Sequence, residues 1–191
     1  MLATAELAEA VGTFLHAHAQ RSVVLAPAMV ATSRDRLLED DAVRAIRALL
    51  PQSSVVTPNL AEAGILLGRA PARSISEMRS QAAALLLAGA ARVLLKGGHL
   101  QDGDEAVDVF ADGDAVVELR ASRVRTVNTH GTGCTLSSAL AALRPQRDSW
   151  VETAIEAKAW LTGALAAADV LQVGPGHGPV HPFHQTCGPR I

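Results

Sequence analysis

Three small or flexible residues and a cysteine stand directly before the helical pattern TLSSALAAL. Glycine lets backbone N–H groups converge on one point, because no Cβ stands in the way. The first N–H groups of a helix lack partners and carry partial positive charge, so Gly131, Thr132 and Gly133 could form an anion hole for a phosphate. Cys134 would follow in the first turn, where a thiol could accept a proton from an attacking hydroxyl. From this stretch alone, a tight turn followed by a small buried cysteine remains the alternative.

Two further polar segments follow short apolar runs. In TPNLAEA, Asn59 and Glu62 are placed so that their oxygens could hold a Mg²⁺ ion, directly or through water. A solvated helix cap is the alternative for this pair. In LLKGGH, Lys96 and Gly97 stand at the end of an apolar run, where the lysine could meet a phosphate. The alternative for Lys96 is a surface lysine beside a turn.

Histidines near the C-terminus offer a different chemistry. The spacing of His177, His181 and His184 could bring two imidazoles together on a metal ion, with Cys187 as a further ligand. The alternative is that these histidines are packed or solvated near the mouth of a site. A metal-binding protein therefore stays open as a second class of function.

The elements that would position these residues alternate along the chain. Short apolar runs at 22–26, 54–57 and 92–96 predict buried strands, and helical patterns lie between them. This alternation is typical of an α/β fold with helices on both faces of a mostly parallel sheet, in which ligands sit outside the carboxyl ends of the strands. A β-hairpin is predicted near residues 106–122, around Asp112-Gly113-Asp114. Helices are predicted over 4–19, 40–50, 60–67, 76–88 and 151–171, and after the glycine loop. In the first helix, one face carries Leu7, Val11, Phe14, Leu15 and His18.

Composition limits the class of protein. The chain has 191 residues, a formal net charge of -2, 49% hydrophobic and 19% charged residues, which predicts one folded domain, 1–191, and argues against disorder and nucleic-acid binding. Its apolar runs are too short to span a bilayer, and its first residues lack the pattern of a secretory signal. Two cysteines make no disulfide framework, so a reducing cytoplasm is the expected location.

Taken in order, the motifs resemble those of one family. VVLAPAM, TPNLAEA, VLLKGGHL, TVNTHGTGCTLSSALAA, EAKAWLTGAL and GHGPVHPFH resemble the hydroxymethylpyrimidine/phosphomethylpyrimidine kinases of thiamine biosynthesis, in the ribokinase-like superfamily. The resemblance covers nearly the whole chain, and GTGC after NTH is its most specific part. It implies phosphorylation of 4-amino-5-hydroxymethyl-2-methylpyrimidine and its monophosphate, with ATP and Mg²⁺ as cofactors and a homodimer as the expected assembly. Neither a membrane nor a nucleic acid is an expected partner.

The same resemblance assigns roles to individual residues. The anion hole for the transferred phosphoryl group and the base toward the substrate hydroxyl would be Gly131, Thr132, Gly133 and Cys134. The metal and its phosphates would be organised by Asn59 and Glu62. The nucleotide side would be formed by Lys96, Gly97, Asn128 and Lys158. The pyrimidine would lie near Met1 and Ala28.

The chain also departs from the family pattern. Family members carry a GSDSGGGAG-like segment before the equivalent of Met1, so we expect the fold to be incomplete at its N-terminus. Ala26 stands where a VVDPVM-like motif usually has aspartate, and the turn at 144–149 lacks a usual glycine. Three accounts remain open: a shortened kinase, a degenerate homologue that binds nucleotide or a partner without turnover, and a half-enzyme completed by another polypeptide.

Overall fold

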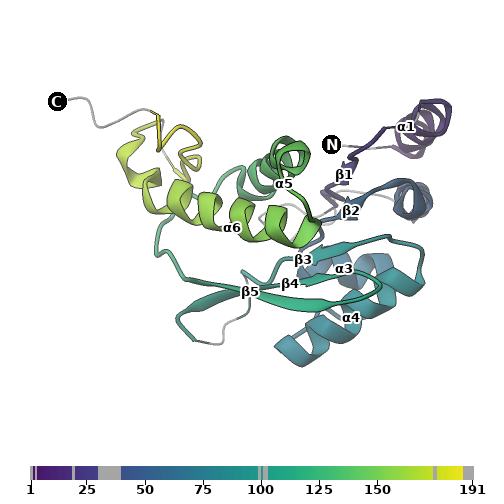
Figure 1. Ribbon diagram of the computed structural model, residues 1–191, viewed down its shortest axis with the longest axis horizontal. Coiled ribbons are helices and arrows are strands. Elements are labelled where there is room, and N and C mark those ends of the chain that lie inside the picture. Colours follow the sequence, from purple (N-terminus) through teal and green to yellow (C-terminus); the bar gives the residue numbers. More distant parts are fainter. Residues whose placement is uncertain are drawn as a thin grey trace.

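A computed structural model of the chain describes residues 2, 4–18, 20–29, 40–98, 100, 103–173 and 176–186. Its centre is one five-stranded sheet in which the strands follow one another in chain order (Figure 1). The first three strands are parallel, and the last two form an antiparallel hairpin whose first strand pairs with the third strand of the sheet. The strands are β1 (Val24–Leu25), β2 (Val55–Val56), β3 (Val93–Leu95), β4 (Glu105–Ala111) and β5 (Val116–Ser122).

Helices cover both faces of the sheet, as predicted. Each face of the sheet has its own buried cluster of apolar side chains. One cluster lies beneath α1 to α4 and the other beneath the last two helices. In Figure 1 the last two helices lie on the opposite side of the sheet from α3 and α4. The helices are α1 (Ala5–Ala17), α2 (Asp40–Ala48), α3 (Leu60–Leu67), α4 (Ile75–Leu87), α5 (Thr132–Leu143) and α6 (Trp150–Ala166), with short 3₁₀ turns at Leu50–Gln52, Arg144–Gln146 and Ala168–Val170.

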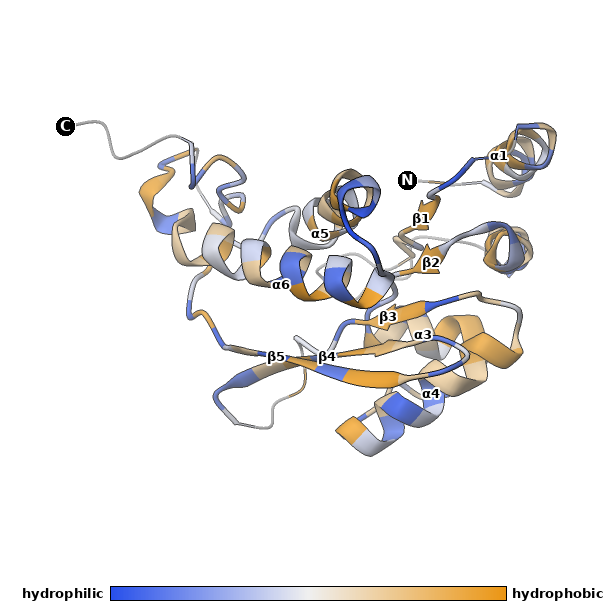
Figure 2. Ribbon diagram, viewed as in Figure 1, coloured by the Kyte–Doolittle hydropathy of each residue, from blue (hydrophilic) through white to orange (hydrophobic). Residues whose placement is uncertain are grey.

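The strands form because their side chains are apolar on both faces. In β3, Val93 and Leu95 enter the cluster under α1 to α4, whereas Leu94 between them enters the cluster under α5 and α6. This alternation follows from the two-residue period of a strand. The strands β1 to β3 are accordingly hydrophobic throughout in Figure 2. The sequence pattern therefore predicted three buried strands correctly, although each is shorter than its apolar run.

Caps fix where several helices begin and end. The Thr4 side chain accepts a hydrogen bond from the Leu7 N–H at the start of α1, as predicted. Gly68 ends α3 in the left-handed conformation, with φ of 64°, which glycine adopts without a steric cost. Both signals were visible in the sequence.

Only part of the predicted face of the first helix packs against the protein, because Val11 lies against the buried cluster under α1 to α4 whereas other residues of that face are exposed. Leu7 and Phe14 of α1 are 49% and 54% exposed, and the buried residues are instead Ala8 and Gly12. A Cβ on Gly12 would lie only 3.1 Å from the side chain of Leu49, so the approach of α1 admits only small residues at this point. Apolar periodicity alone gave the packing face only in part, because close helix packing here selects small side chains beside Val11 rather than large ones.

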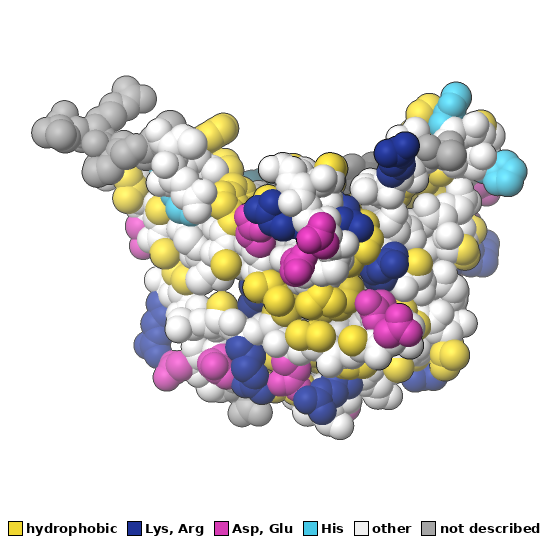
Figure 3. Space-filling model, viewed as in Figure 1, with side chains coloured by type: hydrophobic (Ala, Val, Ile, Leu, Met, Phe, Trp, Pro, Cys, Tyr) yellow, Lys and Arg dark blue, Asp and Glu magenta, His cyan; other side chains and the backbone are white. Residues whose placement is uncertain are grey.

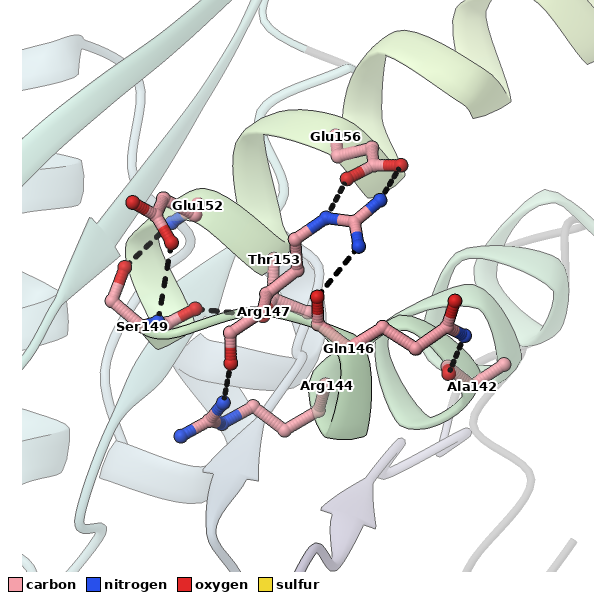
Figure 4. A network of polar contacts seen from close by, with 8 residues as sticks. All are labelled: Ala142, Arg144, Gln146, Arg147, Ser149, Glu152, Thr153 and Glu156. Atoms are coloured by element: carbon pink, nitrogen blue, oxygen red, sulfur yellow. Dashed lines mark hydrogen bonds and ion pairs between the residues drawn. The ribbon is translucent and has the colours of Figure 1, made fainter.

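The turn between α5 and α6 is held by side chains (Figure 4). Arg144 donates to the carbonyl of Arg147, and Arg147 forms an ion pair with Glu156. Ser149 and Glu152 then cap α6 reciprocally, at 3.1 Å and 3.3 Å between donor and acceptor. These contacts define the turn without any residue in a left-handed conformation.

One face of β5 carries charged side chains. Glu118 and Arg120 of β5 form ion pairs with each other and with Arg79 and Glu105. Figure 3 shows the molecule from the same side as Figure 1. Hydrophobic side chains gather in the middle of this view, between groups of charged side chains. No helix in the described part of the chain is long and apolar enough to cross a membrane.

Candidate active site

Three polar segments converge where β2 and β3 end and α5 begins. The Lys96 N–H donates to the carbonyl of Pro58 at 2.9 Å, which pairs the residue after β3 with the start of the segment after β2. The hydroxyls of Thr57 and Ser137 are hydrogen-bonded at 2.9 Å and join the end of β2 to α5. The parallel strands thus bring Asn59, Lys96 and the glycine loop to one edge of the sheet.

The glycine loop presents free backbone N–H groups. Gly131 caps α5 with φ of 81°, a conformation that favours glycine. Within the described residues, no acceptor is bonded to the N–H of Gly133 or of Cys134. Because the partial positive charge of a helix lies at these groups, they suit an anion such as a phosphate. Cys134 is exposed in the same first turn and is not packed among core side chains.

The ammonium of Lys96 lies against this helix entrance. Its Nζ is 3.2 Å from the point that a Cβ on Gly133 would occupy, so the glycine leaves room for the lysine. Within the described residues, Lys96 Nζ has no hydrogen bond or ion pair with another side chain. Burial lowers the pKa of the Lys96 ammonium from its ordinary value, whereas the acidic groups of Glu62, Asp108 and Cys134 act in the opposite direction. A phosphate at the loop would supply the missing direct counter-charge.

Asn59 and Glu62 form a reciprocal cap at the start of α3. The Glu62 N–H donates to Asn59 Oδ1 at 2.9 Å, and the Asn59 N–H donates to Glu62 Oε2 at 2.8 Å. Glu62 is only 4% exposed, and its second oxygen, Oε1, is not used by this cap. The described residues contain no group of three or more His, Cys, Asp or Glu side chains that could hold a metal. The pair therefore fits a Mg²⁺ ion that keeps its waters and takes most of its ligands from phosphates.

A buried carboxylate that the sequence analysis missed supports the lysine segment. Asp108 Oδ1 accepts the N–H of Gly97 at 2.9 Å, and Asp108 Oδ2 pairs with Lys158 Nζ at 2.8 Å. Asp108 and Lys158 are each 7% exposed. Lys158, expected at the nucleotide, thus has its ammonium bonded to a protein carboxylate. The signal that could have revealed Asp108 is its place within the apolar run AVDVFA, where a lone carboxylate requires a partner.

Asn128 and Ala28 occupy different surroundings. The Asn128 side chain donates to Asp169 and accepts the Gly178 N–H, both at 2.8 Å, so it fastens the C-terminal segment beside the glycine loop. Ala28, four residues after the start of β1, has φ of 45°, which is uncommon for a residue with a Cβ. Met1 lies outside the described residues.

The C-terminal histidines are separately placed. His177 Nδ1 is 3.0 Å from the Val127 carbonyl, His181 is 7% exposed, and the ring of His184 packs against Trp160 with centroids 5.7 Å apart. These three rings form no metal-binding group among the described residues, and Cys187 lies outside them. The described part of the chain gives no support to the metal-binding alternative.

Comparisons with known proteins show the family of the chain. Residues 1–181 match the family model described as phosphomethylpyrimidine kinase. The hydroxymethylpyrimidine/phosphomethylpyrimidine kinase of Salmonella typhimurium is 52% identical over 185 residues, which cover 96% of this chain and 69% of that protein. The protein of the same name from Escherichia coli is 49% identical, with the same coverage of 96% and 69%.

Solved structures show the same fold. The pyridoxal kinase from Staphylococcus aureus in complex with AMP-PCP and pyridoxal matches with a TM-score of 0.87 and 31% identity, over 97% of this chain and 66% of that one. The phosphomethylpyrimidine kinase from Clostridium difficile 630 matches with a TM-score of 0.73 and 27% identity, over 86% of this chain and 66% of that one. The chain spans about two thirds of the length of these relatives. The ribokinase-like fold is confirmed, and the chain belongs to the phosphomethylpyrimidine kinase family.

Proposed function

We propose that this chain carries the phosphoryl-transfer site of a kinase that uses ATP to phosphorylate 4-amino-5-hydroxymethyl-2-methylpyrimidine and its monophosphate in thiamine diphosphate biosynthesis. One observation carries the proposal: the Lys96 ammonium lies beside the Gly133 position, at a helix entrance with two unbonded N–H groups and an exposed thiol. The names of the relatives support the choice of substrate. The structures of Staphylococcus aureus pyridoxal kinase with ADP and AMP-PCP support the choice of nucleotide.

Each residue has a defined task in this reaction. Phosphoryl transfer requires mainly that a protein aligns the reactants and neutralises charge. The N–H groups of Gly133 and Cys134 and the Lys96 ammonium would bind oxygens of the transferred group, whose negative charge matches theirs. Cys134 Sγ would accept the proton of the substrate hydroxyl, and a base of this kind contributes roughly 10²–10⁴-fold to the rate.

Glu62 would hold Mg²⁺ through a water with its remaining carboxylate oxygen, and Asn59 would keep that carboxylate in place through the shared cap. When bound, the metal supplies positive charge between the phosphates. We propose that Ala28 and Met1 border the pyrimidine, and that Asn128 acts on the nucleotide side by fixing the loop before Gly131. The activity of the whole protein is a proposal, because about one third of the length of these relatives lies outside the part that this chain spans.

A coupled assay of ADP release, run with the pyrimidine alcohol and separately with its monophosphate, tests the proposal. It is run on this chain and on the same chain extended at its N-terminus with the corresponding segment of the Salmonella typhimurium relative, with pyridoxal as a competing acceptor. We expect turnover with both pyrimidines, by the extended chain at least, and a loss of turnover with Cys134→Ala. ATP binding without turnover by either form would contradict the kinase function.

A further inference from the structure

The chain contains only two lysines, Lys96 and Lys158. The other 15 of its 17 Lys and Arg residues are arginines. These two lysines are far apart in sequence: Lys96 directly follows β3, and Lys158 lies within α6. Both are nevertheless linked to one carboxylate, since Asp108 pairs with Lys158 and also accepts the N–H of Gly97, the residue after Lys96. Lysine has a compact ammonium on a flexible stem, whereas arginine presents a wide planar fork. These two positions therefore carry a compact point charge rather than a planar fork.

Each carboxylate oxygen of Asp108 already has a partner within the protein. Its Oδ1 is occupied by the Gly97 N–H at 2.9 Å and its Oδ2 by Lys158 Nζ at 2.8 Å. All three groups are buried, so each depends on the others for hydrogen bonds. The carboxylate therefore holds Gly97, the residue after Lys96, and its charge is neutralised by the Lys158 ammonium of α6.

We propose that Lys158 is the fixed counter-cation of Asp108, and that this pairing leaves Lys96 as the one lysine whose ammonium meets the nucleotide phosphates. The proposal rests on the proposed kinase function and assigns Lys158 and Asp108 as positioning residues rather than ligands of the nucleotide. It accounts for a lysine buried in the middle of α6, among Ala154, Ala157 and Leu161, where an unpaired charge would be strongly unfavourable.

Charge balance gives the physical reason. Among the described residues, the carboxylates whose charges act on Lys96 are Glu62 and Asp108, and the carboxylate of Asp108 is already paired with the Lys158 ammonium. If Lys158 lost its charge, Asp108 would be a buried anion without its ion-pair partner, and its attraction for the Lys96 ammonium would no longer be offset. Lys96 would then be drawn toward Asp108 and away from Gly133. With Lys158 in place, Lys96 instead keeps its position over the glycine loop, without a direct partner among the described residues.

Labelling with an acyl phosphate of ATP tests this arrangement, and it requires no turnover. A lysine amine near the phosphates attacks the acyl carbon of this probe, an amide forms, and ATP leaves with the oxygen of the broken mixed anhydride. Because the chain has only two lysines, peptide mass spectrometry assigns the label without ambiguity. We expect Lys96 to be labelled, at least about tenfold more than Lys158, and excess ATP to protect it. Equal or greater labelling of Lys158 would overturn the proposal.

Two variants separate positioning from stability. In Lys158→Met, labelling of Lys96 should fall at least about tenfold, because Asp108 is left as an unpaired buried charge. In the double variant Asp108→Asn/Lys158→Met, the amide oxygen can still accept the Gly97 N–H and no buried charge is left unpaired, so labelling should return to within about threefold of the original. Arg147→Met, which removes a cation from an ion pair with Glu156 on the outside of α6, is the matched control and should not change labelling.

The outcomes distinguish this proposal from the kinase function. The counter-cation role is wrong if Lys96 is labelled as fully in Lys158→Met as in the original chain. It is also wrong if the double variant is well folded but does not regain labelling. In both cases the conclusion that the chain binds nucleotide stands. If equilibrium dialysis detects no ATP binding by the original chain and no label appears, the proposed function fails, and the present proposal fails with it. Circular dichroism of each variant shows which of them are folded.

Discussion

Gly97 is the position where the smallest change should have the largest structural effect. A Cβ added there would lie 2.1 Å from the carbonyl oxygen of Val107, and 2.8 Å and 3.0 Å from two atoms of the Met78 side chain. The first of these contacts is with backbone of the neighbouring strand, which cannot rotate away as a side chain can. Gly97→Ala therefore forces the segment after Lys96 to separate from β4.

The size of the effect can be worked out from these distances. Raising the contact with Val107 from 2.1 Å to about 3.0 Å requires a movement of about 1 Å. The hydrogen bond from the Gly97 N–H to Asp108, now 2.9 Å long, would be stretched by such a movement. Overpacking of a core typically costs about 1–3 kcal/mol, and a weakened hydrogen bond to a charged group adds to it. We expect the free energy of unfolding to fall by about 3 kcal/mol.

Urea denaturation followed by circular dichroism measures this loss, with Gly98→Ala as the matched control. Nothing lies within 4 Å of a Cβ on Gly98, and its backbone is not in the left-handed region, so this neighbour should change stability by less than about 0.5 kcal/mol. ATP affinity should fall only in Gly97→Ala, because Lys96 moves with its neighbour. Equal stabilities of the two variants would refute the argument that the backbone of β4 requires glycine here.

Three other substitutions probe single contacts. Cys134→Ala should lower kcat for ADP release roughly 10²–10⁴-fold while dialysis finds ATP affinity unchanged, since the thiol would act on a proton and not on the nucleotide; an unchanged kcat would exclude it as the base. Asn59→Ala removes the cap of α3 and should lower the free energy of unfolding in urea by about 1 kcal/mol. Gly68→Ala places a Cβ at φ of 64° and should lower the free energy of unfolding by about 1–2 kcal/mol in the same measurement. An unchanged free energy of unfolding would mean that the helix can end one residue earlier without strain.

Local signals in the sequence predicted a large part of the fold. The apolar runs around β1, β2 and β3, the start of α1 at Thr4, the end of α3 at Gly68 and the turn of the hairpin were all predicted and confirmed. Each is determined by a residue's own backbone preference or by contacts with neighbours in sequence. The glycine loop at the start of α5 belongs to the same group, because the left-handed Gly131 and the exposed Cys134 follow from local geometry.

Features that depend on contacts distant in sequence were harder to predict. The packing face of α1 was predicted only in part, because the side chain of Leu49 limits how large a residue can be at the closest approach of that helix. Lys158 was expected at the nucleotide, since nothing within α6 reveals the carboxylate 50 positions earlier that binds it. The site residues were predicted as separate motifs, and only the parallel order of β1, β2 and β3 brings them to one edge.

Asp108 shows that part of this distant information is nevertheless present in a strand pattern. In β4, Val109 and Ala111 enter the cluster under the first four helices, whereas Phe110 enters the cluster under α5 and α6. The two-residue period then places Asp108 on the same face as Phe110, beneath a helix that must supply a cation. Only two lysines exist in the chain, and Lys96 belongs to the neighbouring strand end, which leaves the lysine of the last long helix as the compact cation that can reach it. A carboxylate inside an apolar strand thus predicts its own partner once the faces of the sheet are assigned.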